Sequence, residues 1–162
     1  MSEEATIAQE IDYAKAIFHH NQDLVNFVDA KAGVILAVDG AILAILSGSS
    51  AATRGLLEQL LFGAGVLLIG ISALLGFLII KPRLNEHIPT TKIFFRAIVA
   101  KSKQDYKESF PSTTKEILDD YLNNIYALAL IQKKKFSYLE VSLYSLLLGL
   151  IPIVATMISL RA

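Results

Sequence analysis

A single carboxylate stands inside an apolar stretch in the first third of the chain. Asp39 is the one charged residue of the segment 32–46. An ionisable group in hydrocarbon costs roughly 2.5 to 3.5 kcal/mol on insertion scales, so it should face protein, water or a partner chain. Carboxylates that gather around water favour hydration and cation passage. The sequence therefore predicts that Asp39 is sheltered by other helices, by water or by a second chain.

Asn21 is the second polar residue whose position suggests chemistry. It interrupts an apolar seam with helical spacing, formed by Ile7, Ile11, Ala14, Phe18, Val25 and Val28. A buried Asn can set the register between helices, as it does in coiled coils, or it can hydrogen-bond a ligand in a cavity. The sequence leaves both interpretations open. His19 and His20 lie beside it, but adjacent residues point about 100° apart on a helix, so we expect no metal site.

Most enzyme classes lack their signature in this chain. There is no cysteine, no Gly-x-Ser-x-Gly nucleophile elbow and no glycine-rich phosphate loop before Lys and Ser or Thr. We therefore expect no catalytic activity and no cofactor. Nucleic-acid binding is not expected either, because the 11 Lys and Arg residues of the segment 81–135 share it with six Asp and Glu residues.

Three apolar runs predict that the chain crosses a membrane. Hydrophobic residues make up 54% of the sequence, and the mean hydropathy is +0.52. The segments 60–80 and 141–160 carry no charge, and at about 1.5 Å rise per residue each reaches roughly 30 Å. The run 32–46 is shorter and spans only if the helix continues through the weakly polar segment 47–53. We predict an all-α polytopic membrane protein with spans at 32–53, 57–80 and 137–160.

The first and last spans are predicted to extend into a helical cytosolic region. The segment 1–31 should form a helix that runs without a break into the first span, and the segment 84–136 should form a helical hairpin. Pro111, Ser112 and Thr113 end the first helical part of this hairpin. Thr113 with Glu116 has the spacing of a capping box, so a new helix should begin there. An apolar stripe from Leu118 to Leu150 then joins the hairpin to the last span. The whole chain, 1–162, is predicted to form one membrane domain.

The distribution of positive charge predicts the orientation in the membrane. Of the 15 Lys and Arg residues, 11 lie in the segment 81–135, while Lys15 and Lys31 precede the first span. Only Arg54 and Arg161 fall on the opposite side. Positive charge is retained in the cytoplasm, so the N-terminus should be cytoplasmic and the C-terminus external.

Small residues predict where helices approach each other. Asp29 and Lys31 mark the entry to the first span, and Gly33 and Gly40 continue from there as a smooth face with Ala37 and Ala44. Gly63 and Gly70, seven residues apart, give the second span a similar face. Three spans provide too few helices to hide both Asp39 and the first face within one chain. We therefore predict a homo-oligomer.

The order of the segments resembles one known family. The run HHNQDLVNFVDAKAGVILAVDGAILAIL is followed by a second span ending in KPRL, by IFFRAIVAKSKQDY and by DYLNNIYALALIQKKKFSYLEVSLYSLLLGL. This order is similar to that of the transmembrane effectors of bacterial Pycsar anti-phage systems. The resemblance implies that a pyrimidine nucleotide cyclase makes cyclic CMP or cyclic UMP on infection, and that the effector then impairs the bacterial inner membrane, causing growth arrest or cell death. The periodicity by itself fits equally a constitutive membrane scaffold or channel subunit without a nucleotide ligand.

The implied ligand indicates which residue types should bind it. A cyclic pyrimidine nucleotide has one phosphate charge, a ribose hydroxyl and an aromatic base with a polar edge, so it needs a cation, an amide and an aromatic ring. The candidates are Arg83, Arg96 and Lys135 for the phosphate, Asn21, Asn123 and Asn124 for hydrogen bonds, and Tyr106, Tyr121 and Tyr126 for stacking. Simpler roles exist for them, since Lys133, Lys134 and Lys135 fit a positive-inside anchor and the tyrosines fit a helix core or its rim.

Overall fold

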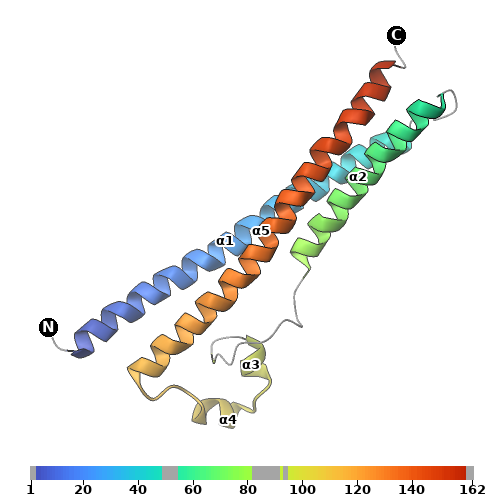
Figure 1. Cartoon of the computed structure of the whole chain (residues 1–162). Helices are drawn as coiled ribbons and strands as arrows, with labels where there is room; N and C mark the ends of the chain where they lie inside the picture. Colours follow the sequence, from blue (N-terminus) through green and yellow to red (C-terminus); the bar gives the residue numbers. More distant parts are fainter. Residues whose placement is uncertain (1–2, 49–54, 82–91, 93–94, 160–162) are drawn as a thin grey trace. The chain divides into compact units, whose positions relative to one another are not determined.

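The computed structural model describes residues 3–48, 55–81, 92 and 95–159. It contains the helices α1 (Glu3–Ser47), α2 (Leu56–Ile80), α3 (Phe95–Val99), α4 (Lys103–Glu108) and α5 (Thr114–Ser159) (Figure 1). No strand occurs among these residues, and α1, α2 and α5 are each long and apolar enough to cross a membrane. The prediction of an all-α protein with three spanning helices is confirmed. The predicted end of the first span, 49–53, lies outside the described residues.

The chain divides into two compact units, and α1 and α5 contribute to both. The first unit comprises Met1–Asn26 and Pro82–Lys133, and the second comprises Phe27–Lys81 and Lys134–Ala162. The second unit therefore holds the apolar halves of α1 and α5 together with α2, and the first holds their polar halves together with α3 and α4. Each long helix is thus continuous from one unit to the next.

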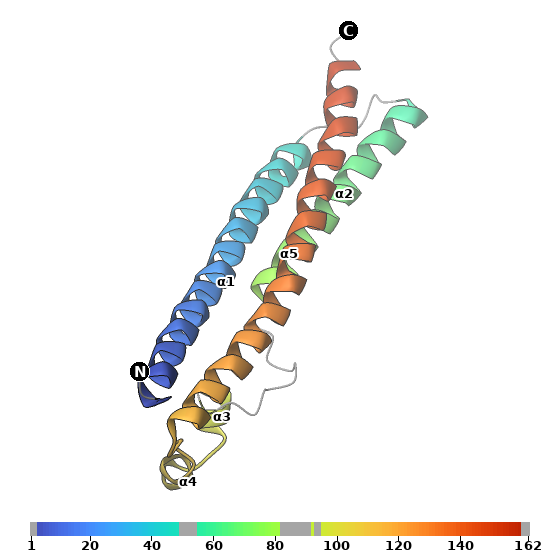
Figure 2. The same cartoon turned by 60° about the vertical axis from the view of Figure 1, so that its left-hand side comes forward.

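An apolar core joins the three helices of the second unit, which lie side by side in both views (Figure 2). Leu46 from α1, Ile69 from α2, and Leu146 and Ile153 from α5 form its main cluster. A smaller cluster contains Val28, Ala32 and Ile79. Both clusters draw on α1 and α2. The end of α1 packs on the middle of α2 and an earlier part of α1 packs on the end of α2, so the two helices are antiparallel.

Glycines set the closest helix contacts of the second unit. A Cβ atom at Gly65 would lie 2.6 Å from Cγ1 of Ile153 and 2.8 Å from the carbonyl oxygen of Gly149, so α2 and α5 touch backbone to backbone here. A Cβ atom at Gly76 would lie 2.9 Å from Cγ of Leu36 on α1. Gly63 and Gly70, which the sequence indicated as a small-residue face of α2, make no such contact among the described residues, because nothing lies within 4 Å of a Cβ atom added at either position.

The second unit has the polarity of a membrane protein, with apolar side chains outside and polar ones inside. Large apolar residues of α2 and α5 are exposed, among them Leu60, Leu67, Leu74, Leu148 and Ile151, each at least 56% exposed. The polar residues Asp39, Ser72, Ser142 and Thr156 are at most 2% exposed. In water this arrangement would expose a large apolar patch, whereas lipid tails cover it at no cost.

The first unit is held together mainly by the polar halves of α1 and α5. Ile11 and Ala14 are buried on α1, and the ring of Phe18 meets the ring of Tyr121 on α5 edge to face at 5.8 Å. At the start of α5, Thr113 Oγ1 accepts a hydrogen bond from the backbone N–H of Glu116 at 3.3 Å. The predicted cap at Thr113 is therefore present, but the Glu116 carboxylate accepts from the N–H of Ser112.

Candidate functional site

Three polar side chains from three different helices meet inside the second unit. Ser72 on α2 donates a hydrogen bond to Oδ2 of Asp39 on α1 at 2.9 Å. Ser142 on α5 donates to the carbonyl oxygen of Ser72 at 3.0 Å, and the two serine hydroxyls are 3.2 Å apart. We call Asp39, Ser72 and Ser142 the buried polar cluster, because each of them is 0% exposed.

The buried polar cluster corrects one expectation from the sequence. Asp39 was expected to need a second copy of the chain for shelter, but three helices of a single chain bury it completely. Ser72 and Ser142 were not predicted as its partners. Serine in an apolar helix commonly bonds its own backbone, so neither residue type nor spacing identifies a partner on another helix.

One oxygen atom of the buried Asp39 carboxylate lacks a described hydrogen-bond partner. Its Oδ1 atom is buried and has no hydrogen-bond partner among the residues that the structure describes. A buried carboxylate oxygen without a partner is costly, because burial removes the water that would otherwise solvate it.

An ion pair lies at the polar end of the second unit. Lys135 on α5 donates a hydrogen bond to Oδ1 of Asp29 on α1, and Lys135 is only 7% exposed. Two residues beyond Asp29 on α1, the Lys31 ammonium lies 4.3 Å from the ring centroid of Phe27. Lys135, a candidate phosphate ligand, is thus already neutralised by Asp29, whereas Lys31 contacts an aromatic face.

In the first unit, Asn21 on α1 contacts α5 through its backbone. Its side-chain amide donates to the carbonyl oxygen of Ile17 on its own helix at 3.0 Å. Its carbonyl oxygen accepts from Nε2 of Gln132 on α5 at 2.6 Å. The side chain in this hydrogen bond between the two helices is therefore that of Gln132, which falls within the stripe 118–150 and was not among the predicted site residues.

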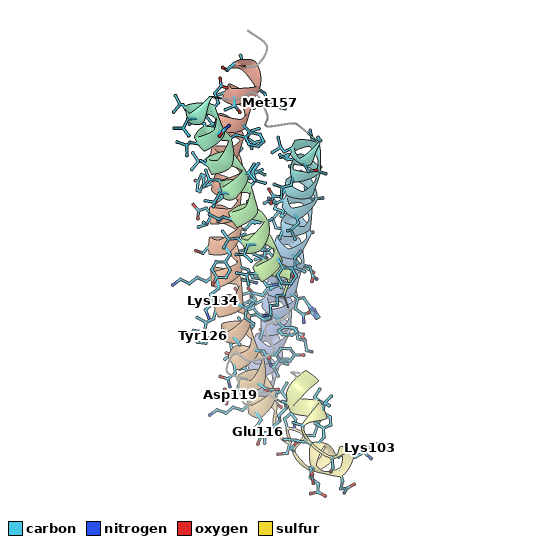
Figure 3. The ribbon with its side chains drawn as sticks, turned by 90° about the vertical axis from the view of Figure 1, so that its right-hand side faces the viewer. Lys103, Glu116, Asp119, Tyr126, Lys134 and Met157 are labelled. Carbon is cyan, nitrogen blue, oxygen red and sulfur yellow. The ribbon has the colours of Figure 1, made fainter. Side chains whose placement is uncertain are left out.

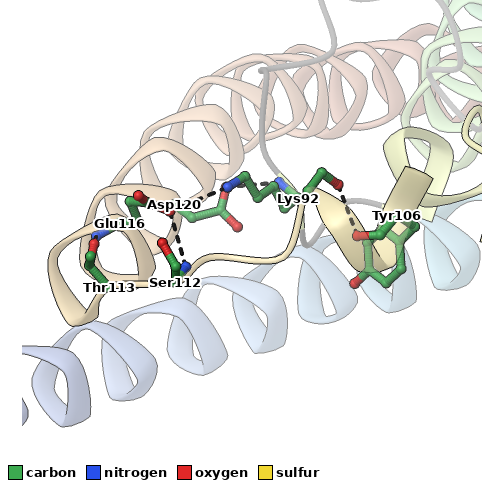
Figure 4. Close-up of polar contacts among 7 residues, drawn as sticks. Lys92, Tyr106, Ser112, Thr113, Glu116 and Asp120 are labelled. Atoms are coloured by element: carbon green, nitrogen blue, oxygen red, sulfur yellow. Dashed lines mark hydrogen bonds and ion pairs between the residues drawn. The ribbon is translucent and has the colours of Figure 1, made fainter. Parts of the chain in front are cut away.

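A second polar group surrounds the start of α5. Asp120, which is 8% exposed, accepts a hydrogen bond from the backbone N–H of Lys92 at 2.8 Å, and the Lys92 ammonium lies 3.6 Å from Glu116 (Figure 4). Asn124, one turn further along α5, is 5% exposed and donates to the carbonyl oxygen of Asp120 at 3.0 Å. Both the backbone and the side chain of Lys92 thus contact the start of α5.

The other residues predicted to bind the nucleotide lie on different helices. Tyr106 on α4 is half-buried and meets the ring of Phe110 edge to face at 6.4 Å, while Tyr126 is 68% exposed on α5 (Figure 3). Asn123 is exposed. Arg96 belongs to α3, but its side chain and the whole of Arg83 lie outside what the structure describes.

Metal coordination by several acidic or imidazole groups finds no support in this part of the chain. Among the described residues there is no group of three or more His, Cys, Asp or Glu side chains that could hold a metal ion. His19 and His20 are both exposed. The described residues offer one fully buried carboxylate bonded to a serine hydroxyl, one partly buried ion pair and a polar first unit.

Comparison with known proteins gave one match. A family model described as the Pycsar effector protein domain matches residues 13–161. Neither the curated proteins nor the solved structures searched gave a match. The family match includes both units.

Proposed function

Because the chain belongs to the Pycsar effector protein domain family, and so is a membrane effector of anti-phage defence, we propose that cyclic CMP or cyclic UMP switches it on. In the proposed sequence of events a pyrimidine nucleotide cyclase makes the nucleotide on infection. The effector binds it, impairs the inner membrane and stops growth or kills the cell.

One observation carries the mechanism. Helices α1 and α5 are each continuous from the polar first unit into the apolar second unit. A ligand that moves the polar half of either helix therefore displaces its apolar half as well, because an α-helix transmits rotation and tilt along its hydrogen-bonded length. Effectors of this family act without catalysis, and a conformational change of these two helices provides such an action.

We assign the nucleotide to the polar residues singled out from the sequence. Arg83 and Arg96 would neutralise the phosphate, Asn21 and Asn124 would hydrogen-bond the ribose or base, and Tyr106 would stack on the ring. Lys135 is the exception, because the phosphate would first have to displace Asp29 from its ammonium. Such an exchange would break a contact between α1 and α5.

The active form is proposed to be a homo-oligomer in the inner membrane with its N-terminus in the cytoplasm. Gly33 and Gly40 on α1 have nothing within 4 Å of an added Cβ, so this smooth face is not used inside the chain. Small residues let helices of neighbouring chains approach closely in lipid. The excess of Lys and Arg in the segments 1–31 and 81–135 supports the orientation.

Calorimetry on the full chain in detergent tests the ligand. Cyclic CMP, cyclic UMP and cyclic AMP should be titrated separately, and we expect a saturable signal for at least one pyrimidine nucleotide and none for cyclic AMP. Co-expression with the cyclase should then depolarise the inner membrane. Absence of binding by all three nucleotides would favour a constitutive scaffold or channel subunit.

A further inference from the structure

Among the residues that the structure describes, no cationic side chain balances the charge of Asp39. Its polar contact there is the Ser72 hydroxyl, and its Oδ1 atom has no hydrogen-bond partner among these residues. On α1 the nearest basic residue is Lys31, eight residues or about 12 Å along the helix axis. On α2 the nearest ionisable residues to Ser72 are Glu58 and Lys81, at the two ends of the apolar run.

The helix α5 does not supply the missing charge either. Its nearest charged residues to Ser142 are Glu140, which is exposed and acidic, and Lys135, which is paired with Asp29. Two residues apart on a helix correspond to a rotation of about 200°, so Glu140 and Ser142 lie on nearly opposite sides of α5. A carboxylate that is 0% exposed therefore lacks a counter-charge on each of the three helices around it.

The buried polar cluster also has one more oxygen–oxygen contact than its two hydroxyl groups have hydrogens to donate. The cluster has three oxygen–oxygen contacts, which join Asp39 to Ser72, Ser72 to Ser142, and Ser142 to the carbonyl oxygen of Ser72. With an ionised carboxylate the two serine hydroxyls provide only two hydrogens for them. A proton on the carboxyl group would give each contact a donor, in the order Asp39 to Ser72, Ser72 to Ser142, and Ser142 to the carbonyl.

We propose that the buried polar cluster is a binding site for one monovalent cation, either H⁺ or Na⁺. The charge fits, because a single carboxylate neutralises a single positive charge, whereas a divalent ion would leave an excess charge in the membrane. The donors also fit, since carboxylate, hydroxyl and carbonyl oxygens are ligands for hard cations. With the cation bound, the buried polar cluster carries no net charge.

Infrared spectroscopy of the full chain in lipid nanodiscs tests the site without any nucleotide. A proton on Asp39 gives the C=O stretch of a neutral carboxylic acid, and this band should be lost in Asp39→Asn. Samples at pH 7 are compared in sodium-free buffer, in NaCl and in choline chloride, which controls for ionic strength. A band that persists in all three buffers assigns the site to H⁺.

The sodium alternative has a different outcome. NaCl, but not choline chloride, should then abolish the band or raise the thermal unfolding temperature, and Asp39→Asn should lose that response. Ser72→Ala provides a second variant, since removing the hydroxyl should shift the band if it belongs to Asp39, and Glu140→Gln should leave it unchanged. Absence of any band assignable to Asp39, together with no sodium-dependent stabilisation, would overturn the proposal.

Discussion

Asp29 on α1 and Lys135 on α5 form an ion pair at the polar end of the spanning helices, and Lys135 is almost completely buried there. The pair joins the two helices that run through both units of the chain. It stands where the sequence changes from polar to apolar on both helices. Any movement that separates α1 from α5 at this level has to break it.

Removal of one partner should therefore destabilise the protein more than removal of both. Asp29→Ala leaves the Lys135 ammonium buried without a counter-charge, at a cost of about 1 to 3 kcal/mol in the free energy of unfolding. The double variant Asp29→Ala with Lys135→Met should recover part of this loss. Thermal unfolding in detergent measures both, with Lys133→Ala on the exposed side of α5 as the control. Equal losses in the single and double variants would mean that the Lys135 ammonium is not destabilising when it is left without Asp29.

The glycines of α2 should differ sharply in their tolerance of a methyl group. Gly65→Ala forces a Cβ atom against Ile153 and the backbone of Gly149, and overpacking of this kind costs about 1 to 3 kcal/mol. Gly63→Ala meets nothing within 4 Å and should be neutral or stabilising by up to about 1 kcal/mol, because alanine favours the helix. Thermal unfolding of both variants in the same detergent measures this difference in stability. A Gly63→Ala loss as large as that of Gly65→Ala would contradict this packing.

The smooth face of α1 is expected to serve assembly and not the fold of one chain. Gly33→Leu with Gly40→Leu should shift the protein toward the monomer, because leucine prevents close approach by a neighbouring helix. Native mass spectrometry and light scattering report the mass in detergent. Val34→Leu, at a position that is 65% exposed on a different side of α1, is the matched control. An unchanged mass in the double variant would exclude this face as the interface.

Asn21 is the residue of the first unit whose two proposed roles can be separated. Asn21→Leu keeps the backbone carbonyl that accepts from Gln132, so a purely structural role predicts little change in nucleotide affinity. As a ligand contact, its loss would leave a polar group of the ribose or base unpaired, which costs about 1 to 3 kcal/mol, or about fivefold to a hundredfold in affinity. Calorimetry with the bound nucleotide measures the difference, and Gln132→Leu controls for the helix contact. Wild-type affinity in Asn21→Leu would leave Asn21 as a packing residue.

Asp39 should matter for membrane damage and not for nucleotide binding. It lies 18 residues beyond Asn21 on the continuous helix α1, which is about 27 Å along the axis. Asp39→Leu should therefore bind nucleotide with wild-type affinity but fail to depolarise the membrane, and Asp39→Asn should retain part or all of the activity. A membrane-potential dye in cells that co-express the cyclase gives the readout. Full depolarisation by Asp39→Leu would reduce this residue to a helix-packing contact.

The sequence by itself determined the all-α class and the three long apolar helices. A run of about twenty apolar residues can cross lipid as an α-helix, because the helix satisfies all of its backbone hydrogen bonds internally. It also determined the start of α5, since the side chain of Thr113 caps the helix within four residues of the chain. These features depend on local hydrogen bonds and on a helical period that can be counted along the sequence. Asp39 was likewise identified from its place in an apolar run.

Only the tertiary structure decided what these residues touch. Nothing in the spacing of Ser72 or Ser142 relates them to Asp39, from which they are 33 and 103 positions away, since they meet only when α2 and α5 pack against α1. The choice of Gly65 and Gly149 over Gly63 and Gly70 has the same origin, because a helix presents glycines on several sides and the rotation of the helix selects which of them face a neighbour. Contacts between distant segments depend on how whole helices pack, and that packing has no local signature in the sequence.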